Sequence, residues 1–471
     1  MPSDVRFDSP AGWTDTDPVP DTHALLSSLS RLSLVGPVAT ATVALVGAVA
    51  LVVLLVAARR SSRRALGIAG AAAVAGTLGA AGVVWAVGRP LPLQLSEVGI
   101  AAVAVAVAGT CAAGAAVASR RGRPVPLSPG RVIGADGAVA VVAAAALSVT
   151  AVVVVNRDTG RYPTLGSVVG HRPPAAVQFV DFDAVPGPQH RVLSGTPVAR
   201  VWRPPLRATR DGLLTHVTIP GARSGFAARP ALVYLPPAYL DSPRPLLPVL
   251  VLVAGNPGKP DDWLGIGLAD IVSRFAAAHQ GLAPVVIVPD ALGADDAVPL
   301  CLDSRLGNVQ TYLAADVPAW AAENLQVDAD PRAWAIGGYS YGGTCAVQLA
   351  VNRPDVYPTF LDISGQDEPS LGDHTETVAA TYGGDERAFA AVSARDELTG
   401  GARPAAVGVF VAGEDDDEYR PQQQRMYAAA AAAGMDVRYY ELPGPHSGRV
   451  WTPAFARELD WIAVRTGLLA P

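Results

Sequence analysis

The stretch AIGGYSYGGTCAVQLA, residues 335–350, changes from an apolar, strand-like run to a helix-like pattern within a few residues. Ser340 lies at this change, between Gly338 and Gly342, in the pattern G-x-S-x-G. Small residues on both sides of a serine permit a sharp turn that lifts the hydroxyl group above the end of a strand. Because a strand precedes the motif and a helix follows it, we interpret Ser340 as a nucleophile rather than as part of a simple glycine-rich turn.

The chain around this motif alternates strand-like and helix-like segments. Two early antiparallel strands are predicted within 213–221 and 228–240, and buried strands within 246–255, 283–292, 333–340, 359–365, 405–415 and 436–444. Helical patterns fall between them, at 263–279, 309–325, 344–354 and 420–434. This alternation predicts the α/β class, with a mostly parallel sheet and helices on both of its faces. Ligands bind such sheets at the carboxyl ends of the strands.

A serine nucleophile on such a turn requires a histidine and an acid, which follow it in the order acid, then histidine. Two histidines follow Ser340. His446 lies in LPGPHSGRVW, a loop with Gly and Pro after the last predicted strand, and is the predicted general base. His374 precedes the candidate acids, so we expect it to be a surface residue.

The acid is sought in the run Glu414–Asp417, which directly follows a predicted strand. Asp416 stands three residues beyond Gly413 and is the predicted acid, with Asp415 as the second choice. The remaining carboxylates of the run are expected to form a solvated loop. The chosen carboxylate would set the histidine tautomer and stabilise the imidazolium.

Acyl transfer also requires backbone donors for the tetrahedral oxyanion. One predicted donor is the amide of Tyr341, the residue after the nucleophile. The other is the amide of Asn256 in VLVAGNPGKPDDW, because the next residue, Pro257, has no N–H group. The alternative is that this second loop is a simple turn.

These pieces together resemble the esterase branch of the α/β-hydrolases, which includes esterase D, feruloyl esterases and trehalose mycolyltransferases. The resemblance runs from about Leu213 to the end and is carried, in order, by VAGNPGKPDDW, LDSRLGNVQTYLAADVPAW, IGGYSYGGTCAVQLA, LDISG, VAGEDD and GPHSGRVW. It implies the α/β-hydrolase fold and a serine hydrolase activity. The chain departs from the pattern at Ala254, where many members have His. The departure alters the rim of the pocket and therefore bears on the choice of substrate.

The first third of the chain has a different composition, almost entirely Ala, Val, Leu and Gly. About 20 apolar residues suffice for a helix to cross a bilayer. Four runs reach this length and predict transmembrane helices, at residues 35–58, 65–88, 98–118 and 132–155. The alternative is that these alanine-rich runs are buried helices of a soluble bundle, although they lack a polar face.

Arginines predict the orientation of these helices, because short cytoplasmic loops collect basic residues. The loops after the first and third runs are arginine-rich, with Arg59, Arg60, Arg63 and Arg64 in one and Arg120, Arg121, Arg123 and Arg131 in the other. We therefore expect a multi-pass membrane protein with its N-terminus and its C-terminal domain outside the cytoplasm. Residues 1–31 are predicted to be a disordered acidic tail, 158–205 a Pro- and Gly-rich linker, and 206–471 the esterase-like domain.

Three cysteines are present, of which Cys111 falls in the third apolar run. Cys301 and Cys345 both belong to the predicted extracytoplasmic domain, where an oxidising compartment favours a disulfide between them. The alternative is two buried free thiols. The sequence contains no Cys and His cluster that suggests a metal, and neither a metal nor another cofactor is expected.

The expected function is that of a membrane-anchored serine esterase acting on acyl or aminoacyl esters of membrane or cell-envelope lipids. Its partners would be that lipid substrate and the bilayer, with no nucleic acid. Two alternatives stay open: an acyltransferase that moves the acyl group to a sugar or lipid hydroxyl, and a catalytically inactive hydrolase-like binding or sensor domain. The sequence leaves the acyl group, the acceptor and the oligomeric state undetermined.

Overall fold

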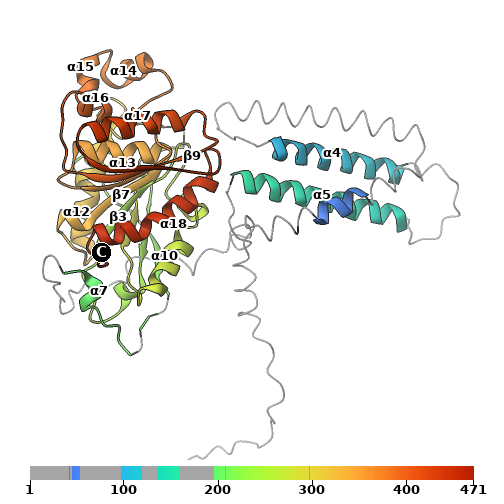
Figure 1. The fold of residues 1–471 in the computed structure, drawn as a ribbon, viewed down its shortest axis with the longest axis horizontal. Helices are drawn as coiled ribbons and strands as arrows, with labels where there is room; N and C mark the ends of the chain where they lie inside the picture. Colours follow the sequence, from blue (N-terminus) through green and yellow to red (C-terminus); the bar gives the residue numbers. More distant parts are fainter. Residues whose placement is uncertain are drawn as a thin grey trace, which may run out of the picture.

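The computed structural model describes residues 42, 45–52, 97–118, 135–159, 196–206, 208–209, 211–295 and 297–471. Its main body is an α/β domain in which helices cover both faces of one sheet (Figure 1). The predicted tail 1–31 and the predicted span 65–88 lie outside the described residues, as do most of the span 35–58 and most of the linker.

The sheet has eight strands in the order β1-β2-β4-β3-β7-β8-β9-β10. Strands β1 and β2 are antiparallel to their neighbours, and the remaining six run parallel to one another. The mostly parallel sheet predicted from the sequence is therefore confirmed. The bounds are β1 Leu213–Val217, β2 Ala231–Leu235, β3 Val249–Val253, β4 Val285–Val288, β7 Trp334–Tyr339, β8 Thr359–Ile363, β9 Val407–Gly413 and β10 Asp436–Leu442, with a separate hairpin of β5 Asp303–Ser304 and β6 Gly307–Asn308.

Helices α10 and α18 lie on one face of the sheet, and α12, α13 and α17 on the other (Figure 1). The central strands have apolar residues along their whole length, since both faces are covered. The helices are α7 Val198–Val201, α8 Pro237–Leu240, α9 Asp262–Gly265, α10 Leu268–Ala278, α11 Val309–Thr311, α12 Val317–Asn324, α13 Tyr341–Asn352, α14 His374–Tyr382, α15 Glu386–Ala390, α16 Ala394–Thr399, α17 Tyr419–Ala432 and α18 Gly448–Arg465, with a π-helix at Tyr312–Asp316 and a 3-10 helix at Pro331–Ala333.

The structure divides two helical patterns that the sequence presents as single helices. The pattern 263–279 is split into α9 and α10 at Gly267, which has a left-handed φ of 90°. The pattern 309–325 contains a π-helical turn just before Pro318, a residue that has no N–H group to continue the helix. Helices α14, α15 and α16 fall between residues 366 and 404, where no helix was predicted.

The domain also includes residues that the sequence assigned to the linker 158–205. Val198 and Trp202 are 6% and 3% exposed. The amides of Val198 and Ala199 donate to the carbonyls of Gly467 and Leu468, so this segment is bound to the end of the chain. Trp202 joins the core through its ring, and its Nε1 donates to the carbonyl of Gln280. Because these contacts are long-range, local composition did not reveal them.

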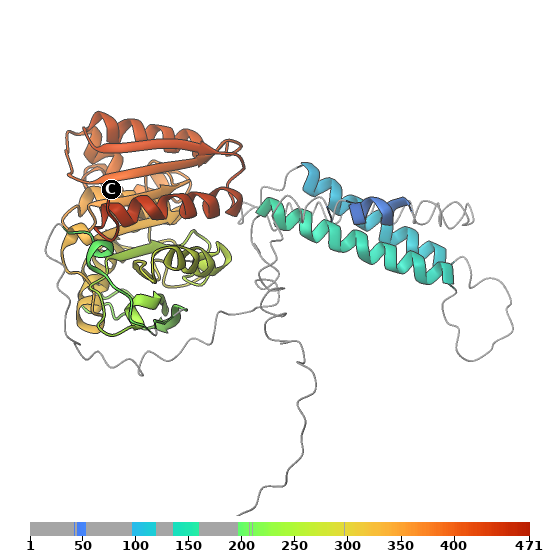
Figure 2. The same ribbon diagram turned by 60° about the horizontal axis from the view of Figure 1, so that its bottom comes forward.

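Before the domain, helices α4 Glu97–Ala118 and α5 Ala135–Thr159 lie side by side (Figure 2). Small residues such as Ala106, Ala143 and Ala151 are buried where they pack, while valines such as Val142 and Val152 are each 68% exposed. Among the helices of the described residues, none combines the length and the apolar content needed to cross a membrane.

Helix α13 packs very closely on the sheet, and glycines make this approach feasible. A Cβ atom at Gly342 would lie 2.1 Å from the carbonyl oxygen of Val253, and one at Gly338 would lie 2.2 Å from the backbone of Gly342. Contacts this short do not occur for real Cβ atoms, and the atoms opposite belong to the backbone. The glycines on both sides of Ser340 are therefore required by packing.

Strand β8 carries Asp362, a fully buried carboxyl group. Its Oδ1 accepts from the amide of Gly365 at 3.0 Å, whereas Oδ2 has no partner among the described residues. Burial raises the pKa of Asp362 to about 7, even though hydrogen bonds to Gln423 and Gly365 act in the opposite direction. We therefore expect a neutral carboxylic acid at this position in mildly acidic solution.

We predict that Gly342→Ala lowers the free energy of unfolding by roughly 1–3 kcal/mol, because overpacking against backbone atoms cannot be relieved by rotation of a side chain. Gly337→Ala is the matched control, since its Cβ would meet Leu252 and Leu361 side-chain atoms at 3.3 Å. Chemical denaturation of both variants measures the difference. Equal losses in the two variants would contradict the packing argument.

A second prediction concerns the pH dependence of the free energy of unfolding. The folded-state pKa of Asp362 is above its unfolded value, so its contribution to stability is complete at low pH and is lost as pH rises through about 7. Asp362→Asn removes this dependence, and between about pH 5 and about pH 8 the wild type should lose roughly 2–3 kcal/mol relative to the variant. Thermal and denaturant unfolding at both pH values measures this. Parallel stability curves for the two proteins would argue against a protonated Asp362.

Candidate active site

Ser340 occupies the turn between β7 and α13 in a strained backbone conformation. Its φ of 55° and ψ of −125° are unusual for a residue other than glycine. The conformation is held by hydrogen bonds from the Ser340 amide to the Ile363 carbonyl at 2.8 Å, and from the Gly343 and Thr344 amides to the Ser340 carbonyl at 2.8 and 3.1 Å. The turn thus presents the hydroxyl group at the carboxyl end of β7, as the sequence predicts.

His446 contacts this hydroxyl group and Asp416 contacts His446, each from a separate loop. His446 Nε2 lies 2.8 Å from Ser340 Oγ, and His446 Nδ1 lies 2.8 Å from Asp416 Oδ2. Asp416 follows β9 and His446 follows β10, so parallel strands bring together groups that are 106 residues apart in the chain. Since an ionised carboxylate only accepts hydrogen bonds, Nδ1 donates to Asp416 and Nε2 is left to accept from Ser340.

All three side chains are removed from solvent. Ser340, His446 and Asp416 are 8%, 4% and 0% exposed. The second oxygen of Asp416 accepts from the Tyr419 amide at 3.0 Å, at the start of α17. Asp415, the second choice of the sequence analysis, has its side chain exposed to solvent. The turn after β9 therefore directs one carboxylate of the acidic run inward and leaves its neighbour outside.

Aromatic rings hold the imidazole of His446 in place. The Tyr419 ring stacks on it with centroids 3.8 Å apart and an interplanar angle of 21°, and Trp451 meets it edge-on at 5.1 Å. Trp451 in turn stacks on Tyr339 at 4.5 Å. The imidazole is thus confined by hydrogen bonds in its plane and by rings above and beside it.

The loop after β3 lies next to the nucleophile. A Cβ atom at Gly255 would be 3.4 Å from Ser340 Cβ and 2.7 Å from the Tyr339 ring. Asn256, a predicted oxyanion donor, is the next residue. Tyr341, the other predicted donor, is the first residue of α13, where backbone N–H groups have no intrahelical acceptor. Both predicted donors therefore belong to backbone segments that border Ser340.

Arg229 connects the loop after β3 to a buried carboxylate, a role that the sequence analysis did not identify. Its Nη2 donates to the Gly258 carbonyl at 2.8 Å, and Nε and Nη2 donate to Asp290 at 3.0 and 2.8 Å. Burial alone would raise the pKa of Asp290, but its hydrogen bonds and its ion pair with Arg229 outweigh burial and lower that pKa. No local motif marks Arg229, because its partners come from separate loops.

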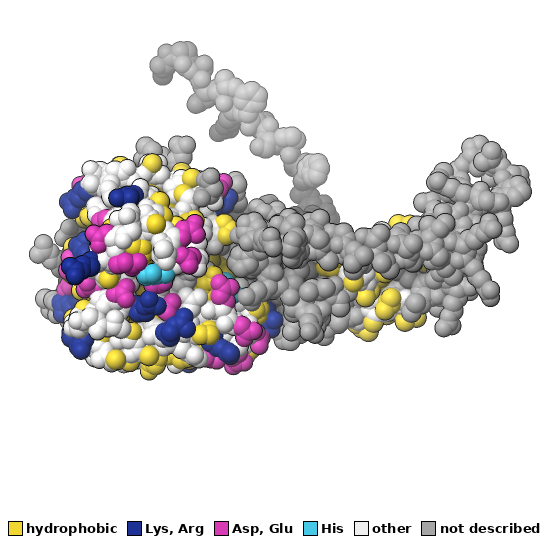
Figure 3. Space-filling model, turned by 90° about the horizontal axis from the view of Figure 1, so that it is seen from above, with side chains coloured by type: hydrophobic (Ala, Val, Ile, Leu, Met, Phe, Trp, Pro, Cys, Tyr) yellow, Lys and Arg dark blue, Asp and Glu magenta, His cyan; other side chains and the backbone are white. Residues whose placement is uncertain are grey.

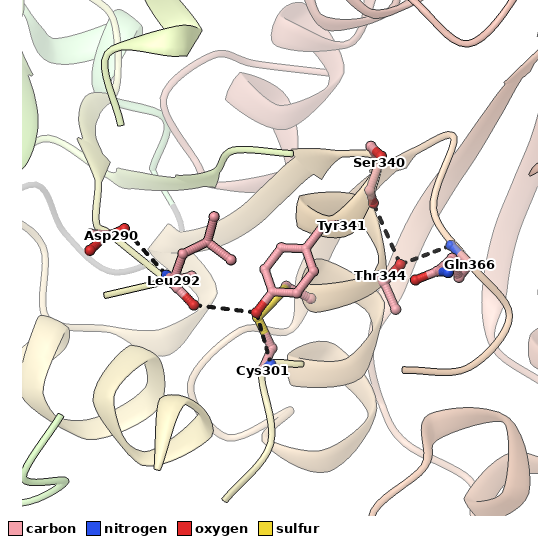
Figure 4. The surroundings of a disulfide bond; sticks show 9 residues. Asp290, Leu292, Cys301, Ser340, Tyr341, Thr344 and Gln366 are labelled. Carbon is pink, nitrogen blue, oxygen red and sulfur yellow. Dashed lines mark hydrogen bonds between the residues drawn. A yellow bond between two sulfur atoms is a disulfide. The ribbon is translucent and has the colours of Figure 1, made fainter. Parts of the chain in front are cut away.

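Cys301 and Cys345 form a disulfide with Cα atoms 5.5 Å apart (Figure 4). The disulfide joins α13 to the loop after β4, close to Tyr341. On the other side of the same helix start, Thr344 Oγ1 accepts from the Gln366 amide at 2.8 Å. Cys111, on α4, is free.

His374 takes no part in this arrangement. It opens α14, has a side chain that is 43% exposed, and contacts Glu368 at 3.2 Å and Glu386 at 3.1 Å. On the face of the domain seen in Figure 3, acidic and basic side chains are intermingled, with a histidine among them. Within the described part of the chain, no group of His, Cys, Asp and Glu side chains could hold a metal ion.

Comparison with known proteins agrees with this fold. The family model described as "Putative esterase" matches residues 227–462. An uncharacterized protein of Corynebacterium glutamicum is 39% identical over 322 residues, which cover 67% of this chain and 73% of the relative. This aligned length exceeds the domain that begins at residue 206, so the similarity extends into the N-terminal region.

Solved structures with a similar domain include a ferulic acid esterase, at 17% identity and a TM-score of 0.47, covering 55% of this chain and 99% of the other. An S-formylglutathione hydrolase from Agrobacterium tumefaciens is 20% identical with a TM-score of 0.46, covering 54% of this chain and 96% of that protein. The family match and the curated relative assign the family without these structures. The chain belongs to the putative esterase family and is a serine hydrolase.

Proposed function

We propose that this protein is a membrane-associated serine esterase that cleaves acyl or aminoacyl esters of membrane or cell-envelope lipids. The observation that carries the catalytic part is the continuous chain of hydrogen bonds from Ser340 through His446 to Asp416. The three groups have the right types, the right order in the chain and the right contacts for nucleophilic acyl transfer.

In the proposed reaction, Ser340 Oγ attacks the ester carbonyl carbon while His446 Nε2 takes its proton. The amides of Tyr341 and Asn256 donate to the oxyanion of the tetrahedral intermediate. His446 then gives the proton to the departing alcohol, and an acyl-serine remains. Water, activated by the same imidazole, attacks the acyl-serine and releases the acid. Asp416 stabilises the imidazolium that forms in each half-reaction.

The lipid substrate is inferred from the N-terminal region. Helices α4 and α5 carry several exposed valines, among them Val139 and Val149 at 51% and 61% exposed. Apolar surface of this kind favours burial in a partner or in lipid. The predicted orientation would place the domain outside the cytoplasm, and the Cys301–Cys345 disulfide is consistent with an oxidising compartment.

We predict that Ser340→Ala and His446→Ala each lower kcat for p-nitrophenyl esters by about 10⁴-fold or more, and that Asp416→Asn lowers it by about 10⁴-fold. Asp415→Asn is the matched control, since its exposed carboxylate lies one residue away, and it should keep activity within about twofold of the wild type. The assay uses the full chain in detergent, with short and long acyl esters. A Ser340→Ala variant that still reacts with a fluorophosphonate probe would refute the nucleophile.

The products of the reaction distinguish ester hydrolysis from acyl transfer. In the same assay with an added sugar or glycerol acceptor, an esterase releases free acid, whereas an acyltransferase forms a new ester with the acceptor. A protein that takes the probe at Ser340 but releases no acid without an acceptor would favour transfer. A protein that neither takes the probe nor turns over any ester would favour a binding domain instead.

Membrane association is a separate prediction. When the full chain is expressed in a bacterial host, we expect it in the membrane pellet, and we expect it to stay there after washing with alkaline carbonate, because helices inserted in hydrocarbon do not depend on electrostatic contacts. This prediction rests on the apolar runs 35–58 and 65–88 of the sequence, since no helix of the described residues can cross a membrane. A cytosolic enzyme of the host is the control that the wash must release. Recovery of the chain in the wash would contradict the anchor and leave the esterase site unaffected.

A further inference from the structure

The side chain of Tyr341 lies in an unusual buried environment. Its backbone N–H is a proposed oxyanion donor, while its phenol ring projects away from Ser340 toward the loop after β4 (Figure 4). Tyr341 is 6% exposed. The proposed reaction uses only its backbone, so the contacts of the phenol require a separate explanation.

The phenol oxygen is hydrogen-bonded on more than one side. It accepts from the Cys301 amide at 3.2 Å, and it donates to the Ala291 carbonyl at 3.3 Å. Burial raises the pKa of Tyr341 far above its ordinary value, so the hydroxyl group keeps its proton and continues to donate. The ring is therefore anchored at its far end.

The loop that supplies this amide is itself strained. Leu300 and Cys301 have φ values of 67° and 53°, two successive residues other than glycine in the left-handed region. Such conformations are unfavourable and persist only where surrounding contacts impose them. Both residues are almost fully buried. In this conformation the Cys301 amide points toward the phenol oxygen.

The same loop is tied to α13 a second time, by the disulfide from Cys301 to Cys345. Tyr341 and Cys345 are four residues apart and so lie on one face of the helix. The start of α13 is thus connected to the loop by the disulfide at Cys345, its fifth residue, and by the hydrogen bond to the phenol of Tyr341, its first residue. Both connections adjoin the turn that carries Ser340.

We propose that Tyr341 is a positioning residue: loop 300–301, held by the disulfide, fixes the phenol and thereby the direction in which the Tyr341 N–H points into the oxyanion hole. An amide in the first turn of a helix has no intrahelical acceptor to orient it, and its effect on an oxyanion depends on distance and direction. The proposal rests on the proposed esterase function.

The test compares Tyr341→Phe with a matched control, Tyr312→Phe. Tyr312 is also buried in this domain, but its hydroxyl group has no hydrogen-bond partner among the described residues, so its loss removes no contact. Both variants are made in the full chain. Active sites are counted by fluorophosphonate titration, so that rates are expressed for each reactive serine rather than for total protein.

We expect Tyr341→Phe to lower kcat per active site about tenfold or more with KM within about twofold, because only transition-state binding is weakened. The dissociation constant of an alkyl boronic acid, which forms a tetrahedral adduct with the serine, should rise by the same factor. The rate of fluorophosphonate labelling should fall in parallel. Tyr312→Phe should match the wild type in all three measurements.

Cys301→Ser/Cys345→Ser provides a second route in case Tyr341→Phe fails to fold. It should lower kcat per active site about threefold or more. Combined with Tyr341→Phe, it should add less than its own factor, because both changes act through one loop. If the loss of kcat in the combined variant equals the product of the separate losses, the two changes do not act through one loop and the proposal is overturned.

Wild-type kcat and labelling rate per site in Tyr341→Phe would overturn the positioning role while leaving the esterase proposal intact. A loss confined to the number of titratable sites would overturn it too, since that result indicates folding alone. A wild-type chain whose Ser340 does not react with the probe would refute the proposed function and this inference together.

Discussion

The left-handed backbone of Ser340 is the constraint on which the rest of the site depends. The residue keeps this conformation because the Ile363 carbonyl accepts from its amide and because α13 begins immediately after it. Helix α13 can begin there only if its first turn lies against the backbone of β3, and Gly342 permits this contact. A side chain at that position would move the helix away and carry the Ser340 hydroxyl group and the Tyr341 amide with it.

The buried carboxylate of the site is stabilised by specific hydrogen-bond partners. Asp416 has no exposed surface, and an isolated carboxylate there would be costly to ionise. The Tyr419 amide and His446 supply hydrogen bonds that compensate this cost. In a medium of low dielectric constant the same carboxylate interacts strongly with an imidazolium, more strongly than an exposed carboxylate such as Asp415 would. The loop geometry after β9 therefore selects one acid from four candidates.

Much of the fold follows from local pattern, because buried parallel strands are apolar throughout and alternate with helices. The side chains of the candidate site are also accessible from sequence, since Ser340, His446 and Asp416 are distinctive residue types at expected strand ends. Two features could not be predicted from the sequence: the docking of Trp202 against Gln280 and the division of the 263–279 helix at Gly267. These features depend on contacts between distant segments, or on one backbone angle that composition does not determine.

The predicted oxyanion donors are harder to identify from sequence than the side chains of the candidate site. Every residue except proline carries a backbone N–H group, so residue type does not mark a donor. The position of the donor depends on the contacts that hold its segment. On one side Arg229 donates to the Gly258 carbonyl in the loop that contains Asn256. On the other side the Cys301 amide donates to the Tyr341 phenol. Both supports come from residues outside the recognisable motifs, and each joins segments far apart in the chain. Substrate preference in such a site can therefore change through supporting residues while the Ser, His and Asp positions stay the same.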